Sequence, residues 1–169
     1  MLHALSLALT PAHLRVTVGE SIVAALAAAV SALVIDVPVW AMFVGWIAYF
    51  TRGVNLRQGL VNLACVLIGL GFGIVAALAT SALTPYLGAA SLTVVVFALA
   101  MVVLSLRLAP VFNNLLGFFL GLVAYFASHL PPSLDAFVEL GAAATLGSAA
   151  GWLASFVQQR LSKPQAEAV

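Results

Sequence analysis

Three asparagines in apolar stretches are the side chains best suited to hold a solute. Asn62 lies five residues after Arg57, inside a hydrophobic stretch, and Asn113 and Asn114 stand at the start of another. A buried amide is costly in hydrocarbon unless its groups are hydrogen-bonded. We therefore expect Asn62 to bond a neighbouring helix or a solute, whereas solvation at the membrane interface remains a second interpretation for Asn113 and Asn114. Neutral amides without counter-charges favour a small neutral solute such as urea, another amide, ammonia or water.

Two carboxylates would supply a different chemistry, proton or cation transfer. Glu20 lies in the first apolar stretch and Glu139 in the last. Acidic residues inside a membrane are by default candidate proton or cation sites. Structural interpretations stay open for both: Glu20 could remain near the lipid head groups or meet a nearby arginine. Glu139 follows Asp135 in the first turns of a helix that Ser133 would cap, where negative charge is favourable.

No catalytic constellation accompanies these residues. The three histidines are far apart in the sequence, with no Cys or acid at metal-ligand spacing. The single cysteine, Cys65, can form no internal disulfide, and no nucleophile motif or phosphate-binding loop is present. A net charge of +1 leaves no basic cluster for nucleic acid. We expect no enzymatic activity, cofactor, metal or nucleic-acid partner.

Six apolar stretches must position these side chains. Hydrophobic residues make up 64% of the 169 residues and charged residues 7%, which is far from the soluble average. The stretches, each interpreted as a membrane span, are Val16–Ile35, Pro38–Thr51, Gln58–Thr80, Ala89–Leu106, Val111–Ser128 and Leu134–Val157. We expect an all-α integral membrane protein with six transmembrane helices in one domain, residues 1–169. Thr10 and Pro11 predict the start of the first helix, after an interfacial segment within residues 1–15; residues 163–169 would form a frayed tail.

The basic residues predict the orientation of the spans. A path that crosses the membrane six times brings all of them to one side: Arg15, Arg52, Arg57, Arg107, Arg160 and Lys163. Cytoplasmic loops carry the excess of Lys and Arg in membrane proteins. Both termini are therefore predicted to be cytoplasmic.

An internal repeat relates the two halves of the chain. Shifting the sequence by 76 positions lays Phe43–Phe50 on Phe119–Phe126, with five of eight residues identical, and lays Gly71 over Gly147. The units, about residues 16–80 and 92–156, would each hold three spans. Because three is odd, the second unit enters the membrane inverted. A 3+3 inverted-topology repeat is a recurring plan of transporters, with the site where the units meet.

Small residues recur at helical spacing in several stretches. Gly69 and Gly73 lie four apart, as do Gly117 and Gly121. This spacing puts each pair on one helix face and lets helix backbones approach closely. Close packing is one interpretation; the other is that these glycines set the width of a narrow pore. Trp46, near the middle of its span, would line or constrict that path, unless it anchors the helix in the interfacial belt.

The motif Trp40-Ala41-x-Phe43-x-Gly45-x-x-Ala48-Tyr49-Phe50 resembles the YcdZ-like family of small bacterial inner-membrane proteins, which is catalogued as a domain of unknown function. The likeness continues through Gly59-Leu60 and the third stretch to Gly117–Phe126. Asn113-Asn114 departs from it, since Pro-Gly-like residues are expected there in relatives. The resemblance implies a multi-pass protein of the bacterial inner membrane, but no substrate or site.

Three functional hypotheses follow. The first is a homo-oligomeric channel or simple transporter for a small neutral polar solute, with its site between the inverted units. A variant is a proton- or cation-coupled carrier that uses Glu20 and Glu139. The alternative is a non-transporting scaffold or accessory subunit, in which the amides and glycines serve only helix packing.

Overall fold

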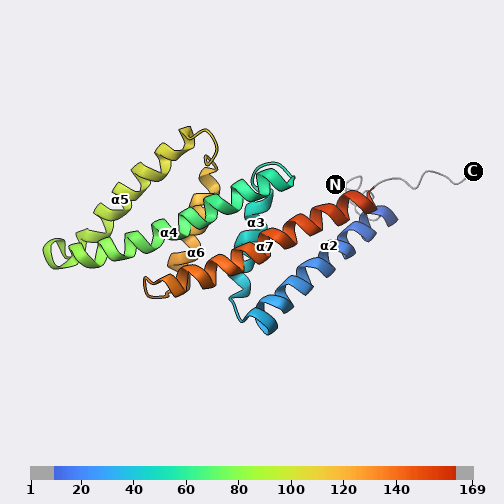
Figure 1. Cartoon of the computed structure of the whole chain (residues 1–169), viewed down its shortest axis with the longest axis horizontal. Coiled ribbons are helices and arrows are strands. Elements are labelled where there is room, and N and C mark those ends of the chain that lie inside the picture. The colour runs from blue at the N-terminus through green and yellow to red at the C-terminus, as the bar shows by residue number, and fades with distance from the viewer. Residues whose placement is uncertain (1–9, 163–169) are drawn as a thin grey trace, which may run out of the picture.

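The described part of the chain consists of helices joined by short connections. The structure is a computed structural model that describes residues 10–162, and no strand occurs among them. Its elements (Figure 1) are α2 Pro11–Val30, the π-helical turn η1 Ser31–Ile35, α3 Val39–Phe50, α4 Leu56–Leu87, α5 Ala90–Ser105, the 3₁₀ turn η2 Leu106–Leu108, α6 Leu115–Ser128 and α7 Leu134–Leu161. The predicted interfacial segment and frayed tail fall largely or wholly outside the described residues.

Within residues 10–162, four helical segments are long and apolar enough to cross a membrane: Pro11–Ile35, Leu56–Leu87, Ala90–Leu108 and Leu134–Leu161. The other two predicted spans are the shorter apolar helices α3 and α6. The apolar stretch from about Val111 becomes helical only after Asn114, which caps α6. In the opposite direction, α4 continues past Thr80 and takes Pro85 into its last turn. These helices indicate an integral membrane protein.

Side-chain caps fix where the helices begin. The hydroxyl of Thr10 accepts a hydrogen bond from the His13 amide at 3.3 Å, with Pro11 in the first turn, which confirms the predicted start of α2. Ser133 caps α7 in the same way and accepts from the Ala136 amide at 3.1 Å, as predicted. Two caps without a sequence prediction, Asn55 at α4 and Asn114 at α6, complete the set.

The two short helices lie at the centre of the molecule and cross the long ones. In Figure 1, α3 and α6 run steeply between the long, inclined helices α4 and α7, while α2 and α5 lie towards opposite ends. The most extensive contacts are those of α3 with α7 and of α6 with α4, followed by α2 with α7 and α5 with α4. Each short helix of one half thus packs mainly on the long helix of the other half.

Glycines make these crossings close. A methyl group at Gly45 of α3 would overlap the carbonyl of Ala144 on α7. A methyl group at Gly121 of α6 would overlap the carbonyl of Val66 on α4. Gly121 lies 76 positions after Gly45, and Ala144 lies 78 positions after Val66. The same kind of contact therefore occurs twice, once in each half.

Two further pairs of contacts follow the same offsets. A side chain at Gly69 would meet the Phe118 backbone, and one at Gly147 would meet the Met42 backbone. One turn further along α4 and α7, Gly73 lies against Tyr125 and Gly151 lies against Tyr49. The predicted equivalence of Gly71 with Gly147 is wrong by two positions, because α6 has 14 residues where α3 has 12. Gly71 has open space instead, with nothing within 4 Å of an added Cβ.

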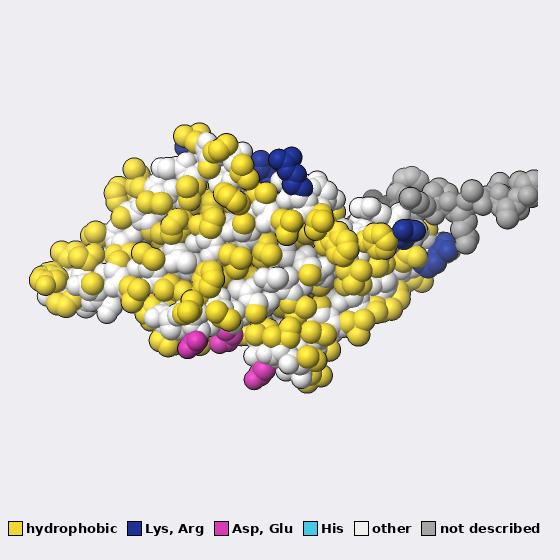
Figure 2. All heavy atoms as spheres, in the orientation of Figure 1, with side chains coloured by type: hydrophobic (Ala, Val, Ile, Leu, Met, Phe, Trp, Pro, Cys, Tyr) yellow, Lys and Arg dark blue, Asp and Glu magenta, His cyan; other side chains and the backbone are white. Residues whose placement is uncertain are grey.

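Apart from Glu20 on α2, charge is separated across the molecule. Figure 2 shows the Lys and Arg side chains along the upper and right edges and acidic side chains along the lower edge, with hydrophobic side chains over most of the surface between them. The carboxylates of Asp36, Asp135 and Glu139 share one shallow pocket. At the other edge, Arg52 follows α3 and donates to Asn113, just before α6. We call these the acidic edge and the basic edge.

The close crossings predict which glycines tolerate a side chain. Gly45→Ala and Gly147→Ala each place a methyl group on a backbone carbonyl, and we expect either change to lower the free energy of unfolding by about 1–3 kcal/mol. Gly71→Ala is the matched control, because its methyl enters open space and alanine favours the helix by up to about 1 kcal/mol. Unfolding by SDS titration in mixed micelles measures all three. Equal losses at the three positions would contradict the crossing.

Candidate functional site

Two of the predicted asparagines meet at the basic ends of the short helices. Asn62 on α4 is fully buried, and Asn114 before α6 is 6% exposed. The amide nitrogen of Asn114 donates to the Asn62 side-chain oxygen at 2.7 Å. The Asn62 amide nitrogen donates in turn to the carbonyl of Tyr49, at the end of α3, at 3.3 Å. One pair of side chains thus links α3, α4 and the start of α6.

Thr51 and Arg52, at the end of α3, add two more links. The Asn114 amide nitrogen also donates to the Thr51 hydroxyl oxygen at 2.7 Å, and Thr51 donates to the Ala48 carbonyl at 2.7 Å. Arg52 donates to the side-chain oxygen of Asn113. We call Thr51, Arg52, Asn62, Asn113 and Asn114 the polar latch. Its bonds join the α3–α4 connection of the first half to the α5–α6 connection of the second.

The buried part of the polar latch is satisfied by the protein itself. The Asn114 side-chain oxygen accepts from the Gly117 amide at 3.3 Å while it caps α6. No buried side-chain nitrogen or oxygen among the described residues is left without a hydrogen bond. The Asn62 and Asn114 amides therefore hold helices together in this conformation, and a solute would reach them only after the latch opens.

The positions that correspond to the two amides are apolar. With the offsets of the paired contacts, Asn62 corresponds to Leu140, which is 1% exposed. Asn114 corresponds to Pro38, which stands before α3 and provides no side-chain cap. The polar latch consequently exists at one end of the crossing only.

The four predicted glycines lie in helix contacts within this chain. Gly69 and Gly73 face α6, and Gly117 and Gly121 face α4. All four are buried, and the opposing helix occupies the space where a passage would run. In this conformation they set the separation of α4 and α6.

Trp46 is half-buried on α3. Its ring lies 6.5 Å from the Phe43 ring and 6.2 Å from the Phe50 ring, measured between centroids. It also packs against the largest buried cluster of the molecule. Trp46 is therefore part of an aromatic row along α3 and lies apart from the polar latch.

The two predicted carboxylates lie far apart. Gly19, beside Glu20 on α2, faces Val157 and Leu161 near the end of α7. Glu139 lies near the start of α7, about 27 Å from Val157 along the helix axis. No group of three His, Cys, Asp or Glu side chains that could hold a metal ion occurs within residues 10–162. The two acids thus do not form one proton or cation site.

Sequence reasoning missed Thr51 and Tyr49. Thr51 ends the second apolar stretch, and only its closeness to Asn114 in space makes it part of the latch. The Tyr49 hydroxyl lies 3.1 Å from the Ser155 hydroxyl, which joins α3 to α7. The sequence signal available for Tyr49 is its place in the repeated eight-residue motif, where Tyr125 is the second copy.

The hydrogen bonds predict coupling between the two asparagines. Asn62→Leu removes the acceptor of Asn114, and we expect it to lower the free energy of unfolding by about 1–3 kcal/mol. Combining it with Asn114→Leu should cost less than the sum of the single changes, by about 0.5–3 kcal/mol. Asn113→Leu is the control, expected within about 0.5 kcal/mol of wild type because its bond to Arg52 is exposed. Strict additivity, measured by SDS titration, would show that the amides act separately.

The comparisons with known proteins find one family of unknown function. A family model described as "Protein of unknown function (DUF1097)" matches residues 17–155. No curated protein and no solved structure matches the chain. Membership in a family of unknown function is thereby confirmed, while the likeness to YcdZ stays a prediction. The six helices and the polar latch described above fall almost wholly within the matched region, and this chain belongs to the DUF1097 family.

Proposed function

We propose that this chain forms a six-span membrane protein from two inverted three-helix units, α2–α4 and α5–α7. The paired crossings support this proposal, because α3 packs on α7 as α6 packs on α4. The helix starts support it too: Pro38 and Asn114 precede α3 and α6, and Asn55 and Ser133 cap α4 and α7 at the same offsets. Three spans per unit invert the second unit relative to the first.

The helix lengths fit a transporter of this plan. The 12 residues of α3 cover about 18 Å and the 32 residues of α4 about 48 Å, against a hydrocarbon core of about 30 Å. Helices longer than the hydrocarbon core then tilt in the bilayer, and α3 and α6 span the core only together with the segments that flank them. Short segments at matching places in two inverted halves are the sequence feature that best points to a transport site.

The distribution of charge supports the orientation. The basic edge faces the cytoplasm in this proposal, and so do both termini. The acidic edge, with Asp36, Asp135 and Glu139, then lies on the outer side. The family resemblance favours the bacterial inner membrane as the location.

For the activity, we propose a carrier of a small neutral polar solute that works by rocking of the two units. The polar latch carries this proposal, because its hydrogen bonds join the units at the cytoplasmic end and the counterparts of its two buried amides, Leu140 and Pro38, are apolar. Breaking the Asn114 bonds to Thr51 and Asn62 would open that end and expose their amide and hydroxyl groups. A closed latch explains why the crossing is packed in this conformation.

The chemistry of the latch favours a neutral solute. Asn62, Asn114 and Thr51 offer donors and acceptors without charge, and the one cation, Arg52, lies at the exposed rim. Urea, small amides, ammonia and water therefore remain the preferred class. A homo-oligomer belongs to the proposal, because a chain of 169 residues leaves little bulk around a solute path.

A second candidate function is a non-transporting scaffold or accessory subunit. The satisfied amide bonds favour it, since they need no solute to compensate Asn62 and Asn114. Under this alternative the latch is permanent, and the glycines and amides only hold the helices for other membrane proteins. Flux measurements separate the two functions.

The carrier predicts that a covalent latch stops flux. Arg52→Cys and Asn113→Cys, combined with Cys65→Ser, place two thiols at the exposed rim of the latch, where a hydrogen bond now joins the side chains, and leave Thr51, Asn62 and Asn114 intact. In liposomes exposed to urea, acetamide, glycerol or osmotic gradients, stopped-flow light scattering should show faster relaxation than in empty vesicles for at least one solute. A short bifunctional methanethiosulfonate should reduce that rate to the empty-vesicle value, and reduction should restore it.

Single-cysteine proteins are the controls for the reagent, because neither can be bridged within one chain. Loss of flux in these controls as well would remove the latch from the mechanism. Relaxation equal to that of empty vesicles for every solute, in protein that reconstitutes, would contradict the carrier and favour the scaffold.

A further inference from the structure

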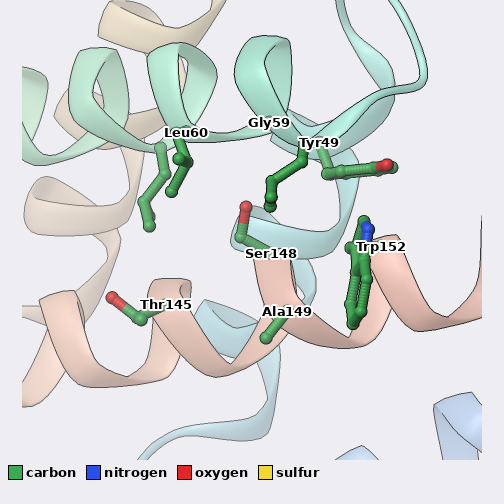
Figure 3. A pocket seen from close by; sticks show the side chains of 9 residues that line it. Tyr49, Gly59, Leu60, Thr145, Ser148, Ala149 and Trp152 are labelled. Atoms are coloured by element: carbon green, nitrogen blue, oxygen red, sulfur yellow. The ribbon is translucent and has the colours of Figure 1, made fainter.

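A pocket of about 180 Å³ lies between α3, α4 and α7, beside the polar latch but separate from it. Figure 3 shows it bounded by Tyr49 of α3, Gly59 and Leu60 of α4, and Ser148 and Trp152 of α7. Leu60 and Trp152 are exposed, so the pocket opens at the apolar surface of the chain. In the proposed orientation this opening faces lipid.

Ser148 is an unusual hydroxyl in this place. The residue is only 6% exposed, and Figure 3 shows its oxygen pointing away from α7 towards α4. The other hydroxyls on the wall are bonded: Thr145 donates to the Gly141 carbonyl at 2.7 Å, and Tyr49 pairs with Ser155. Among residues 10–162 the Ser148 side chain makes no hydrogen bond, and its oxygen borders the pocket instead of being fully enclosed by protein.

A hydroxyl that faces an apolar space without a hydrogen bond is unfavourable and is usually avoided. Serines in helices commonly avoid this cost by donating to the carbonyl four residues earlier, as Thr145 does in the same helix. Ser148 instead presents its hydroxyl to the pocket, where a ligand can satisfy it.

The other half of the chain lacks these features. By the 78-position offset, Ser148 corresponds to Leu70 and Gly59 corresponds to Phe137. Leu70 is fully buried, and Phe137 packs against the same apolar cluster. Two large apolar side chains thus stand where Ser148 and Gly59 line the pocket. The pocket is a departure from the repeat, and packing of the repeat does not require it.

We propose that this pocket binds a small uncharged ligand the size of one aromatic ring, with one hydroxyl or carbonyl that bonds Ser148. The size follows from the volume, because an apolar cavity of about 150 Å³ is known to take up benzene. No charged side chain lines the pocket, which disfavours an ion. Trp152 and Tyr49 offer aromatic edges or faces to a ring. This inference goes beyond the proposed carrier, since a scaffold could hold the same ligand.

The test uses 4-fluorophenol and fluorobenzene as probes of the full chain in detergent micelles, followed by fluorine NMR. Wild-type protein should bind both probes saturably, and excess phenol should displace them. Ser148→Leu fills the pocket with the residue that stands at the corresponding position of the other half, so it should abolish both signals. Ser148→Ala should weaken 4-fluorophenol by about 2- to 10-fold and leave fluorobenzene unchanged.

Ser81→Leu, on an exposed part of α4, is the matched control and should bind like wild type. Circular dichroism and size-exclusion chromatography establish that each variant is folded. If Ser148→Leu does not fold, the different response of the two probes to Ser148→Ala still decides the matter. Non-saturable uptake by wild type, or equal weakening of both probes in Ser148→Ala, would overturn the proposal. Because binding is read without flux, failure of the carrier leaves this result unaffected.

Discussion

The close crossing of a short helix over a long one is the constraint on which the rest of the structure depends. At Gly45 and Gly121 the backbones of two helices come so near that no side chain fits between them. Association of helices in lipid relies on such packing, since apolar side chains gain little there from leaving lipid for protein. The crossings bring Tyr49, Asn62 and Asn114 to one place, although they come from three different helices.

The two halves share a framework but differ at its ends. The framework is the set of paired glycine contacts, which recur at offsets of 76 and 78 positions. At the basic edge, Asn62 and Asn114 make a bonded polar group and Ser148 opens a pocket. Leu140, Pro38 and Leu70 stand at the corresponding places near the acidic edge. The glycine contacts that recur in both halves thus determine how the helices pack. The residues that differ between the halves form the polar latch and the pocket, for which a function can be proposed.

Hydropathy, caps and glycine spacing predict much of this fold. Apolar runs locate all six helices, and Thr10 and Ser133 mark two of their starts, because capping is local chemistry. The start of α6 is missed, since hydropathy alone cannot show that Asn114 caps the helix. The two-position shift between Gly71 and Gly69 is missed because it arises from two extra residues of α6. Asn62 and Asn114 are predicted as important, but their mutual bond depends on a crossing that joins distant segments.

Sidedness of two loops tests the inverted arrangement most directly. Single cysteines at Gly53, in the α3–α4 connection, and at Pro131, in the α6–α7 connection, occupy similar places in the two halves. In a Cys65→Ser background, a membrane-impermeant maleimide added to intact cells should label Pro131→Cys and leave Gly53→Cys unlabelled until the membrane is permeabilised. Labelling of both cysteines from the same side would contradict inverted halves, and with them the carrier built on their movement.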